Sequence, residues 1–124
     1  MNFKVYPNRP FLSRNFIPLR KGARLLDIGC GNGDISAYFA RGNDQYGVDV
    51  SDRRRDGNRN FRFSVVGSEY LPYEDRYFDI VMSHHVIEHV DDQDRHLAEI
   101  HRVLKPAGIL YLATPNRTSP LMNS

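Results

Sequence analysis

The feature that most constrains this chain is a short apolar run that leads directly into a cluster of glycines. The run is Arg24–Ile28 (RLLDI), and Gly29–Gly33 (GCGNG) follows without a break. Such a run is typical of a strand buried on both faces, and glycine permits the sharp turn that leaves it. Asp34–Arg41 then predicts a helix, with Gly42 as its stop. This order of strand, glycine turn and helix predicts a parallel α/β sheet.

The rest of the chain continues the alternation of strands and helices. Further strands are expected at Tyr46–Val50, Phe61–Val66, Tyr77–Ser83 and Ile109–Ala113, and a second helix at Asp91–Lys105. Acidic residues begin that helix, basic residues end it, and one apolar stripe runs along it. Several strands lack an alternation of apolar and polar residues, so both faces of the sheet should be covered. We predict an α/β fold with a doubly wound, mostly parallel sheet of about five strands.

Length and composition limit the number of domains and the kinds of partner that the chain could have. The 124 residues allow one domain, which we divide into an N-terminal segment with a short helix (1–23), a ligand-binding domain (24–116) and a polar tail (117–124). Lys and Arg number 17 against 15 Asp and Glu, so charge gives no reason to expect nucleic acid or a membrane as a partner. A single cysteine and the lack of any long apolar run favour a cytoplasmic protein.

The segment between the second and third predicted strands departs from the scheme. Ser51–Asn60 is short for a crossover helix and contains three consecutive arginines, Arg53 to Arg55. An anion-binding or nucleic-acid patch is one interpretation of such a run. A solvated loop or a stunted helix is the interpretation that we favour.

The glycine loop and a later aspartate together predict a nucleotide site. Asp49 ends the second predicted strand, 20 residues after Gly29, so both should lie at the carboxyl edge of the sheet. An aspartate there accepts hydrogen bonds from ribose hydroxyls, and the helix start favours an anionic group. A dinucleotide fingerprint would need a third glycine at position 34, where this chain has Asp34. Asp34 therefore argues against a protein that binds NAD or a nucleotide sugar, which we keep as an alternative function.

At these residues the sequence resembles the class I S-adenosylmethionine-dependent methyltransferases. Four blocks in the family's order carry the resemblance: LLDIGCGNGDIS, YGVDVS, VVGSEYLPYEDRYFDIVMSHHVIEHV and LAEIHRVLKPAGILYLATPNR. The resemblance implies a Rossmann-like fold and methyl transfer from S-adenosyl-L-methionine to a small-molecule acceptor. A truncated module that binds the cofactor without catalytic activity is the alternative function.

The resemblance also implies which residues contact the cofactor. Those that would line its methionine and ribose part are Asp27, Gly29, Cys30, Gly31 and Gly33; Asp49 would bind the ribose hydroxyls, Val50 would lie against adenine, and Gly67, Ser68 and Glu69 would edge the adenine ring. The family often has G-D-A-E-x-L-P-F at this last segment, with the aspartate on the adenine amino group. Here Gly67 or Ser68 aligns with that aspartate, so the acidic contact is absent or moves to Glu69.

Two histidines follow the fourth predicted strand. His84 and His85 are the candidate catalytic residues, because methyl transfer to a hydroxyl needs a general base; alternatively, they shape the pocket without transferring a proton. The string from His85 to His89 matches the H-x-x-E-H zinc-peptidase pattern, but it begins at a strand end rather than within a helix. It also resembles the E-x-x-E-H metal-binding segment of small-RNA 3′-end methyltransferases, with His85 in place of the first glutamate. We predict no metal site.

Members of this family usually continue past the fifth strand with two more strands. Eleven residues follow Ala113 here, so we expect a truncated member in which the last two family strands are missing. The strand Ile109–Ala113 would then be an open edge with unpaired N–H and C=O groups. Either the N-terminal segment or a second copy of the chain in a homodimer would cover it.

Overall fold

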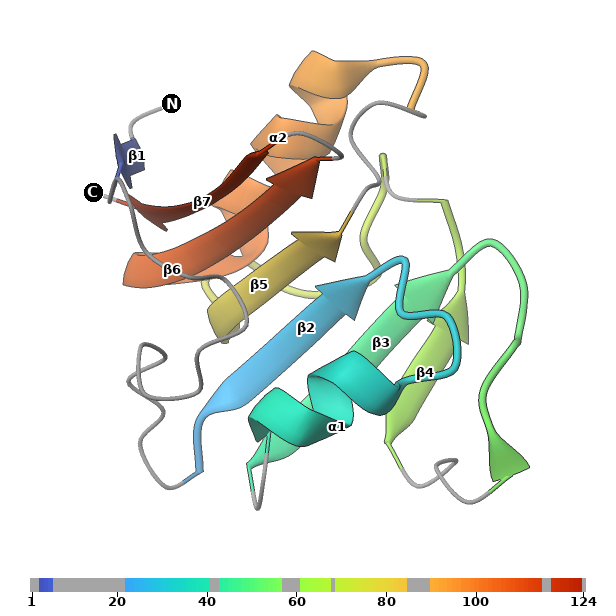
Figure 1. The fold of residues 1–124 in the computed structure, drawn as a ribbon. Helices are drawn as coiled ribbons and strands as arrows, with labels where there is room; N and C mark the ends of the chain where they lie inside the picture. Colours follow the sequence, from blue (N-terminus) through green and yellow to red (C-terminus); the bar gives the residue numbers. More distant parts are fainter. Residues whose placement is uncertain are drawn as a thin grey trace.

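One mixed sheet organises the molecule. The computed structural model describes residues 3–5, 22–40, 43–56, 61–67, 69–84, 90–114 and 117–123. Within them the strand order is β1-β7-β6-β5-β2-β3-β4 (Figure 1). The elements are β1 (Phe3–Val5), β2 (Arg24–Ile28), α1 (Asp34–Ala40), β3 (Asp44–Asp49), β4 (Arg62–Val65), β5 (Phe78–His84), α2 (Gln93–Val103), β6 (Leu104–Thr114) and β7 (Arg117–Asn123).

The central five strands and both helices confirm the predicted fold class. Strands β4, β3, β2, β5 and β6 pair in parallel. Helix α1 contacts β2 and β3, whereas α2 contacts β6, and the two helices cover opposite faces of the sheet (Figure 1). The N-cap of α2 is Asp92, whose Oδ1 accepts the N–H of Arg95 at 3.0 Å. A cap of this kind satisfies one of the free N–H groups at a helix start.

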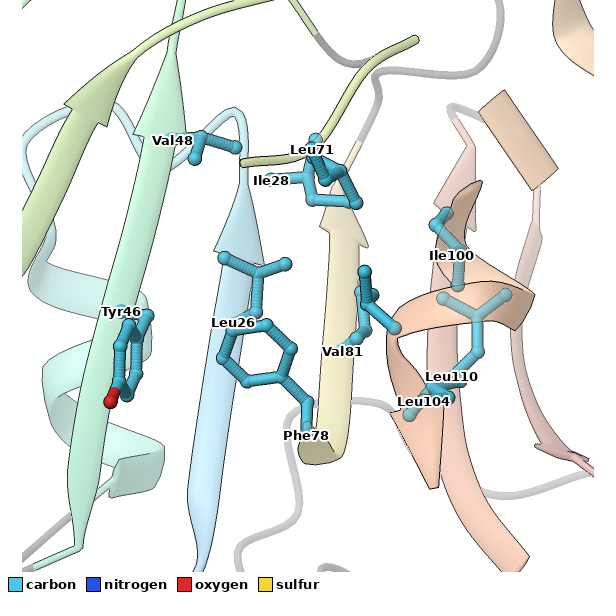
Figure 2. Close-up of a cluster of buried hydrophobic side chains, with 11 residues drawn as sticks. Leu26, Ile28, Tyr46, Val48, Leu71, Phe78, Val81, Ile100, Leu104 and Leu110 are labelled. Atoms are coloured by element: carbon cyan, nitrogen blue, oxygen red, sulfur yellow. The ribbon is translucent and has the colours of Figure 1, made fainter. Parts of the chain in front are cut away.

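The larger core lies between the sheet and α2. Leu26, Val81 and Leu110 come from three neighbouring strands and are fully buried together with Ile100 of α2 (Figure 2). Successive strand residues point to opposite faces, so Leu25 belongs to a second cluster on the other face. Burial on both faces explains the continuous apolar pattern of β2 and fixes the strand that leads into the glycine loop.

The edge beside β6 differs from the expectation. Residues 117–123, expected as a polar tail, form β7, which runs antiparallel to β6 with Thr114 opposite Arg117. Strand β1 pairs antiparallel with β7 in turn. Pairing satisfies the backbone groups that an open strand would expose. The sheet is therefore wider than five strands, and no second copy is needed to cover the edge of β6.

Two further expectations concern the N-terminal helix and the possibility of a membrane-spanning helix. The short helix predicted within residues 1–23 lies outside the described residues, of which this segment contains only 3–5 and 22–23. No helix in the described part of the chain is long and apolar enough to cross a membrane.

Candidate functional site

The glycine loop turns sharply between β2 and α1 and is bound to the neighbouring strand. Gly29, Gly31 and Gly33 have φ values of 74°, 55° and 86°, a region that side chains other than glycine adopt at a cost. The N–H groups of Gly29 and Cys30 both donate to the carbonyl of Val48 on β3, at 2.8 and 3.2 Å. The three predicted glycines therefore shape a loop that is held against the end of β3.

Asp49 at the end of β3 lies beneath this loop. Its Oδ2 accepts the N–H of Gly31 at 2.9 Å and Nη2 of Arg53 at 3.0 Å, and its Oδ1 accepts the N–H of Val50 at 2.7 Å. Burial alone would raise the pKa of Asp49, but these donors lower it below its ordinary value. The site thus has an ionised carboxylate, an acceptor suited to the hydroxyls of a ribose.

Asp27 is a second carboxyl under the loop, in a different electrostatic state. It is buried on β2, and burial raises its pKa to about 7, while a hydrogen bond from Ser36 lowers it and the charge of Asp49 raises it further. Among the described residues, the groups that act on Asp27 are therefore a hydroxyl and another acid. A nearby positive charge would stabilise its ionised form, and S-adenosylmethionine carries a sulfonium and an ammonium. The buried carboxyl of Asp27 is therefore compatible with that positively charged cofactor.

The floor of the loop is closely packed and includes a residue that the sequence analysis did not single out. A Cβ on Gly47 would lie 2.7 Å from Cε2 of Phe61 and 2.9 Å from Sγ of Cys30. Glycine inside a strand often marks such a close approach, so the signal was present. Burial, together with the charges of Asp27 and Asp49, raises the pKa of the Cys30 thiol to about 12, and the thiol therefore packs as a neutral group.

The arginine run forms a loop that lies against the glycine loop. Residues 51–55 contain no helix, as the favoured interpretation of a solvated loop expects, and residues 57–60 lie outside the described residues. The N–H of Arg55 donates to the carbonyl of Asn32 at 3.3 Å. Each arginine also pairs with an aspartate: Arg53 with Asp49 at 3.0 Å, Arg54 with Asp52 at 2.8 Å and Arg55 with Asp34 at 2.7 Å. The residue that replaces the third dinucleotide glycine is thus an ion-pair partner of this loop.

The residues expected near adenine come from the ends of β3 and β4. The N–H of Val66 donates to the carbonyl of Asp49 at 2.9 Å, which brings the start of the next segment to the site. Val50 is 74% exposed, and a Cβ on Gly67 would meet no atom within 4 Å. Glu69 is half-buried, and Ser68 lies outside the described residues. An exposed apolar side chain beside open space is compatible with a planar ring.

The segment between β4 and β5 is fastened to α2 by an ion pair. Glu99 accepts the N–H of Leu71 at 2.7 Å and pairs with Arg102 at 2.8 Å. Arg102 also donates to the carbonyls of Leu71 and Tyr73, at 2.9 and 2.7 Å. These bonds lower the pKa of Glu99, with Arg102 as the largest cause. The segment beyond Glu69 is therefore anchored to α2.

The two candidate catalytic histidines are only partly placed. His84 is the last residue of β5 and stands opposite Ala113 of β6. Its neighbour Ser83 is opposite Ile28, the residue that precedes the glycine loop. The backbone of His84 therefore lies at the same sheet edge as the loop. His85 and the rest of the H-x-x-E-H string lie outside the described residues.

Comparison with known proteins identifies relatives that match the part of the chain containing the glycine loop and Asp49. Residues 26–112 match the model of a family described as a methyltransferase domain. The chain is similar to the ubiquinone biosynthesis O-methyltransferase of Sinorhizobium fredii, with 38% identity over 107 residues, which cover 79% of this chain and 43% of that protein. It is also similar to the 27-O-demethylrifamycin SV methyltransferase of Amycolatopsis mediterranei, with 38% identity over 108 residues, 77% of this chain and 40% of that protein.

A solved structure gives the same result for the fold. The YcgJ protein from Bacillus subtilis superposes with a TM-score of 0.71 and 29% identity, covering 80% of this chain and 47% of that one. The chain thus spans less than half of each of these relatives. Its match includes the glycine loop, Asp49 and the parallel strands that carry them. The chain belongs to the methyltransferase domain family, the class I S-adenosylmethionine-dependent methyltransferases.

Proposed function

We propose that this chain binds S-adenosyl-L-methionine and takes part in transfer of its methyl group to a small-molecule acceptor. The observation that carries the proposal is the buried, ionised carboxylate of Asp49, which accepts the N–H of Gly31 across the glycine turn. Family membership supports the methyl donor, and the names of both curated relatives support a small acceptor.

The chain's residues would act on the cofactor by position and charge. S-Adenosylmethionine supplies a methyl group already activated by its sulfonium, so alignment is the protein's main task. Asp49 would hold the ribose hydroxyls, and Gly29 and Gly31 would let the backbone approach the ligand. The buried carboxyl of Asp27 would stabilise the positive charge of the cofactor. The exposed Val50 would lie against adenine, with Gly67 to Glu69 at the edge of the ring.

A thermal-shift comparison tests the binding step. S-Adenosylhomocysteine at 100 times its dissociation constant should stabilise the chain by about 2.7 kcal/mol, whereas NAD should have no effect. The Asp49→Ala variant is the matched control, since it should show a smaller shift with S-adenosylhomocysteine. A shift with NAD alone would replace this proposal by a dinucleotide-binding function.

The catalytic step is a separate proposal. His84 and His85 would act as the general base for a hydroxyl acceptor, an acceptor class that the O-methyltransferase name of one relative supports. A cofactor with a labelled methyl group and a panel of small phenols measures transfer. His84→Ala and His85→Ala should retain affinity for S-adenosylhomocysteine and lose transfer. Full transfer in both variants would remove the role of base.

A second candidate function shares the binding site. The alternative is a module that binds the cofactor without transferring the methyl group; the chain spans 43% and 40% of the two relatives described above. The labelled-methyl assay separates the two functions, because a binding module would show the thermal shift and no transfer to any acceptor.

A further inference from the structure

A buried hydrogen bond joins the end of β5 to α2, outside the residues assigned to the cofactor. Oγ of Ser83 lies 3.2 Å from Nε2 of His96, and both side chains are fully buried. Ser83 is the penultimate residue of β5 (Phe78–His84). His96 lies in the first turn of α2, where its N–H donates to the carbonyl of the N-cap residue Asp92 at 3.0 Å. The contact therefore fastens the end of the strand to the start of the helix.

Ser83 is a polar side chain at an apolar position. Alternate residues of a strand share a face, so Ser83 faces α2 together with Val81, a member of the larger core. Ile28 stands opposite Ser83 on β2 and Leu112 stands opposite it on β6; Ile28 belongs to that core and Leu112 packs against it. A hydroxyl buried among such neighbours costs free energy unless it has a hydrogen-bond partner. His96 supplies a partner across the interface between helix and sheet.

The position of this bond in the sheet relates it to the proposed reaction. From β2 the chain continues to β3 and β4 on one side, whereas β5 leads to β6 on the other (Figure 1). In such sheets, ligands bind beyond the carboxyl ends of the strands where the order reverses, which here is between β2 and β5. Ser83 pairs with Ile28, the residue before the glycine loop, and His84 follows Ser83. The bond therefore lies directly behind the edge at which the glycine loop begins and β5 ends.

The pair does not act on a substrate directly. A serine beside a histidine is also the arrangement that activates a hydroxyl nucleophile. A nucleophile must touch its substrate, however, and neither of these side chains is exposed. A buried polar pair instead rigidifies the core and specifies its geometry.

We propose that Ser83 and His96 are positioning residues for methyl transfer: their hydrogen bond fixes the end of β5 against α2 and so places the backbone of His84. The inference rests on the proposed function, because it takes His84 as the general base. It adds to that function two residues that act through His84 rather than on the ligands. A loosened strand end would misalign the base, and a misplacement of about 1 Å can lower a rate by about 100-fold.

The first test measures kinetics with the labelled cofactor and the phenol that wild type methylates fastest. Ser83→Ala and His96→Leu each remove the bond, so kcat should fall by about 10- to 100-fold while the affinity for S-adenosylhomocysteine stays within about twofold. His96→Gln keeps an amide near the position of Nε2 and should recover most of kcat. The double variant with Ser83→Ala and His96→Leu should be no slower than either single variant, because both changes remove the same interaction.

Val81→Ala is the matched control for lost stability. Val81 is fully buried on the same face of β5, and its truncation leaves a cavity without removing a polar group. The variant should have a lower free energy of unfolding and an unchanged kcat. A loss of kcat as large as that of Ser83→Ala would show a general effect of packing, and the positioning role would be wrong.

Hydrogen exchange of the ligand-free proteins tests the geometry without the reaction. In His96→Leu the amides of residues 82–84 should exchange faster relative to those of residues 79–81 in the same strand, whereas His96→Gln should resemble wild type. Equal exchange at residues 82–84 in His96→Leu and wild type would overturn the inference, because the strand end would then not depend on the bond.

The outcomes separate this inference from the proposed function. If wild type transfers the methyl group and both Ser83→Ala and His96→Leu keep its kcat, the positioning role is wrong while the function stands. A loss of affinity for S-adenosylhomocysteine that matches the loss of transfer also overturns it, because the bond would then support the cofactor site as a whole. If wild type binds S-adenosylhomocysteine and methylates no phenol, the catalytic proposal fails and this inference fails with it.

Discussion

Nη2 of Arg53 lies 3.0 Å from Oδ2 of Asp49, the carboxylate oxygen that also accepts the N–H of Gly31. The oxygen that we propose as the ribose acceptor therefore already has a cationic partner within the chain. A ribose hydroxyl that donates to this oxygen competes with the guanidinium. The side chain of Arg53 is 65% exposed, so the competing pair is screened by solvent.

Arg53→Ala should therefore tighten the binding of S-adenosylhomocysteine. Exposed ion pairs contribute up to about 1 kcal/mol, which corresponds to about fivefold in affinity. Titration calorimetry at low salt measures the change, and Arg54→Ala is the matched control because Arg54 pairs with Asp52 instead. Weaker binding in Arg53→Ala would mean that the guanidinium contacts the ligand rather than competing with it.

Asp49→Ala should weaken the binding of S-adenosylhomocysteine by about 10- to 100-fold, since hydrogen bonds to a charged group contribute roughly 1.5–3 kcal/mol. Asp49→Asn should lie between this variant and wild type, because it keeps an oxygen that can accept the N–H of Gly31. Circular dichroism checks that the fold is kept. Unchanged affinity in a folded Asp49→Ala protein would show that the ribose lies elsewhere.

Asp27 should make stability fall as the pH rises. Its pKa is raised from 3.8 to about 7 in the folded chain, mainly by burial, so the folded state holds a proton that the unfolded state releases. The contribution is complete below about pH 4 and is lost by about pH 7, an effect on the order of 4 kcal/mol. Urea unfolding of Asp27→Asn from pH 4 to pH 8 should lack this part of the pH dependence. Parallel curves for the two proteins would contradict the assignment.

Glu99 should have the opposite pH dependence. Its pKa is lowered, with Arg102 as the first cause, so its contribution is present above the ordinary pKa of a glutamate and is lost as the pH falls through the lowered value. Glu99→Gln should lower the free energy of unfolding at pH 7 by roughly 1.5–3 kcal/mol. The loss should shrink in acid. An equal loss at pH 7 and pH 3 would mean that packing, not charge, anchors the segment at Leu71.

Gly47→Ala should destabilise the chain, because its Cβ would lie 2.7 Å from Phe61 and 2.9 Å from Cys30. Overpacking of this kind costs typically about 1–3 kcal/mol. The double variant with Cys30→Ala should recover part of the loss, since one of the two crowded contacts is removed. Additive effects in a double-mutant cycle would show that the two residues do not press on each other.

Local sequence patterns predicted the elements that carry the site. Arg24–Ile28 has the predicted bounds as β2, and α1 (Asp34–Ala40) begins at the predicted residue, while Arg41 lies outside the described residues. These elements follow from apolar runs and glycine punctuation, which act over a few residues. The glycine loop and Asp49 were predicted from the same signals and from family resemblance, and the structure brings them within one hydrogen bond.

Contacts between distant segments were not predictable in this way. Strand β7 contains Pro120 and has no apolar alternation, so its strand conformation depends on the edge of β6 that it pairs with. The contact between Gln45 and Ser36 joins a strand to a helix and has no local pattern. The sequence favoured a solvated loop for the arginine run, and most of its described residues are exposed. The ion pair between Arg53 and the buried Asp49 was not predicted.

The two hydrogen bonds from Gly29 and Cys30 to the carbonyl of Val48 have a consequence for recognition. They fix the bend of the backbone before any nucleoside arrives, so little chain entropy is lost when one docks. Such preorganisation means that differences in affinity among related ligands should arise mainly in how fast they leave. The backbone of the turn after β2 is therefore preorganised, and we expect selectivity among nucleosides to come from the side chains around the turn.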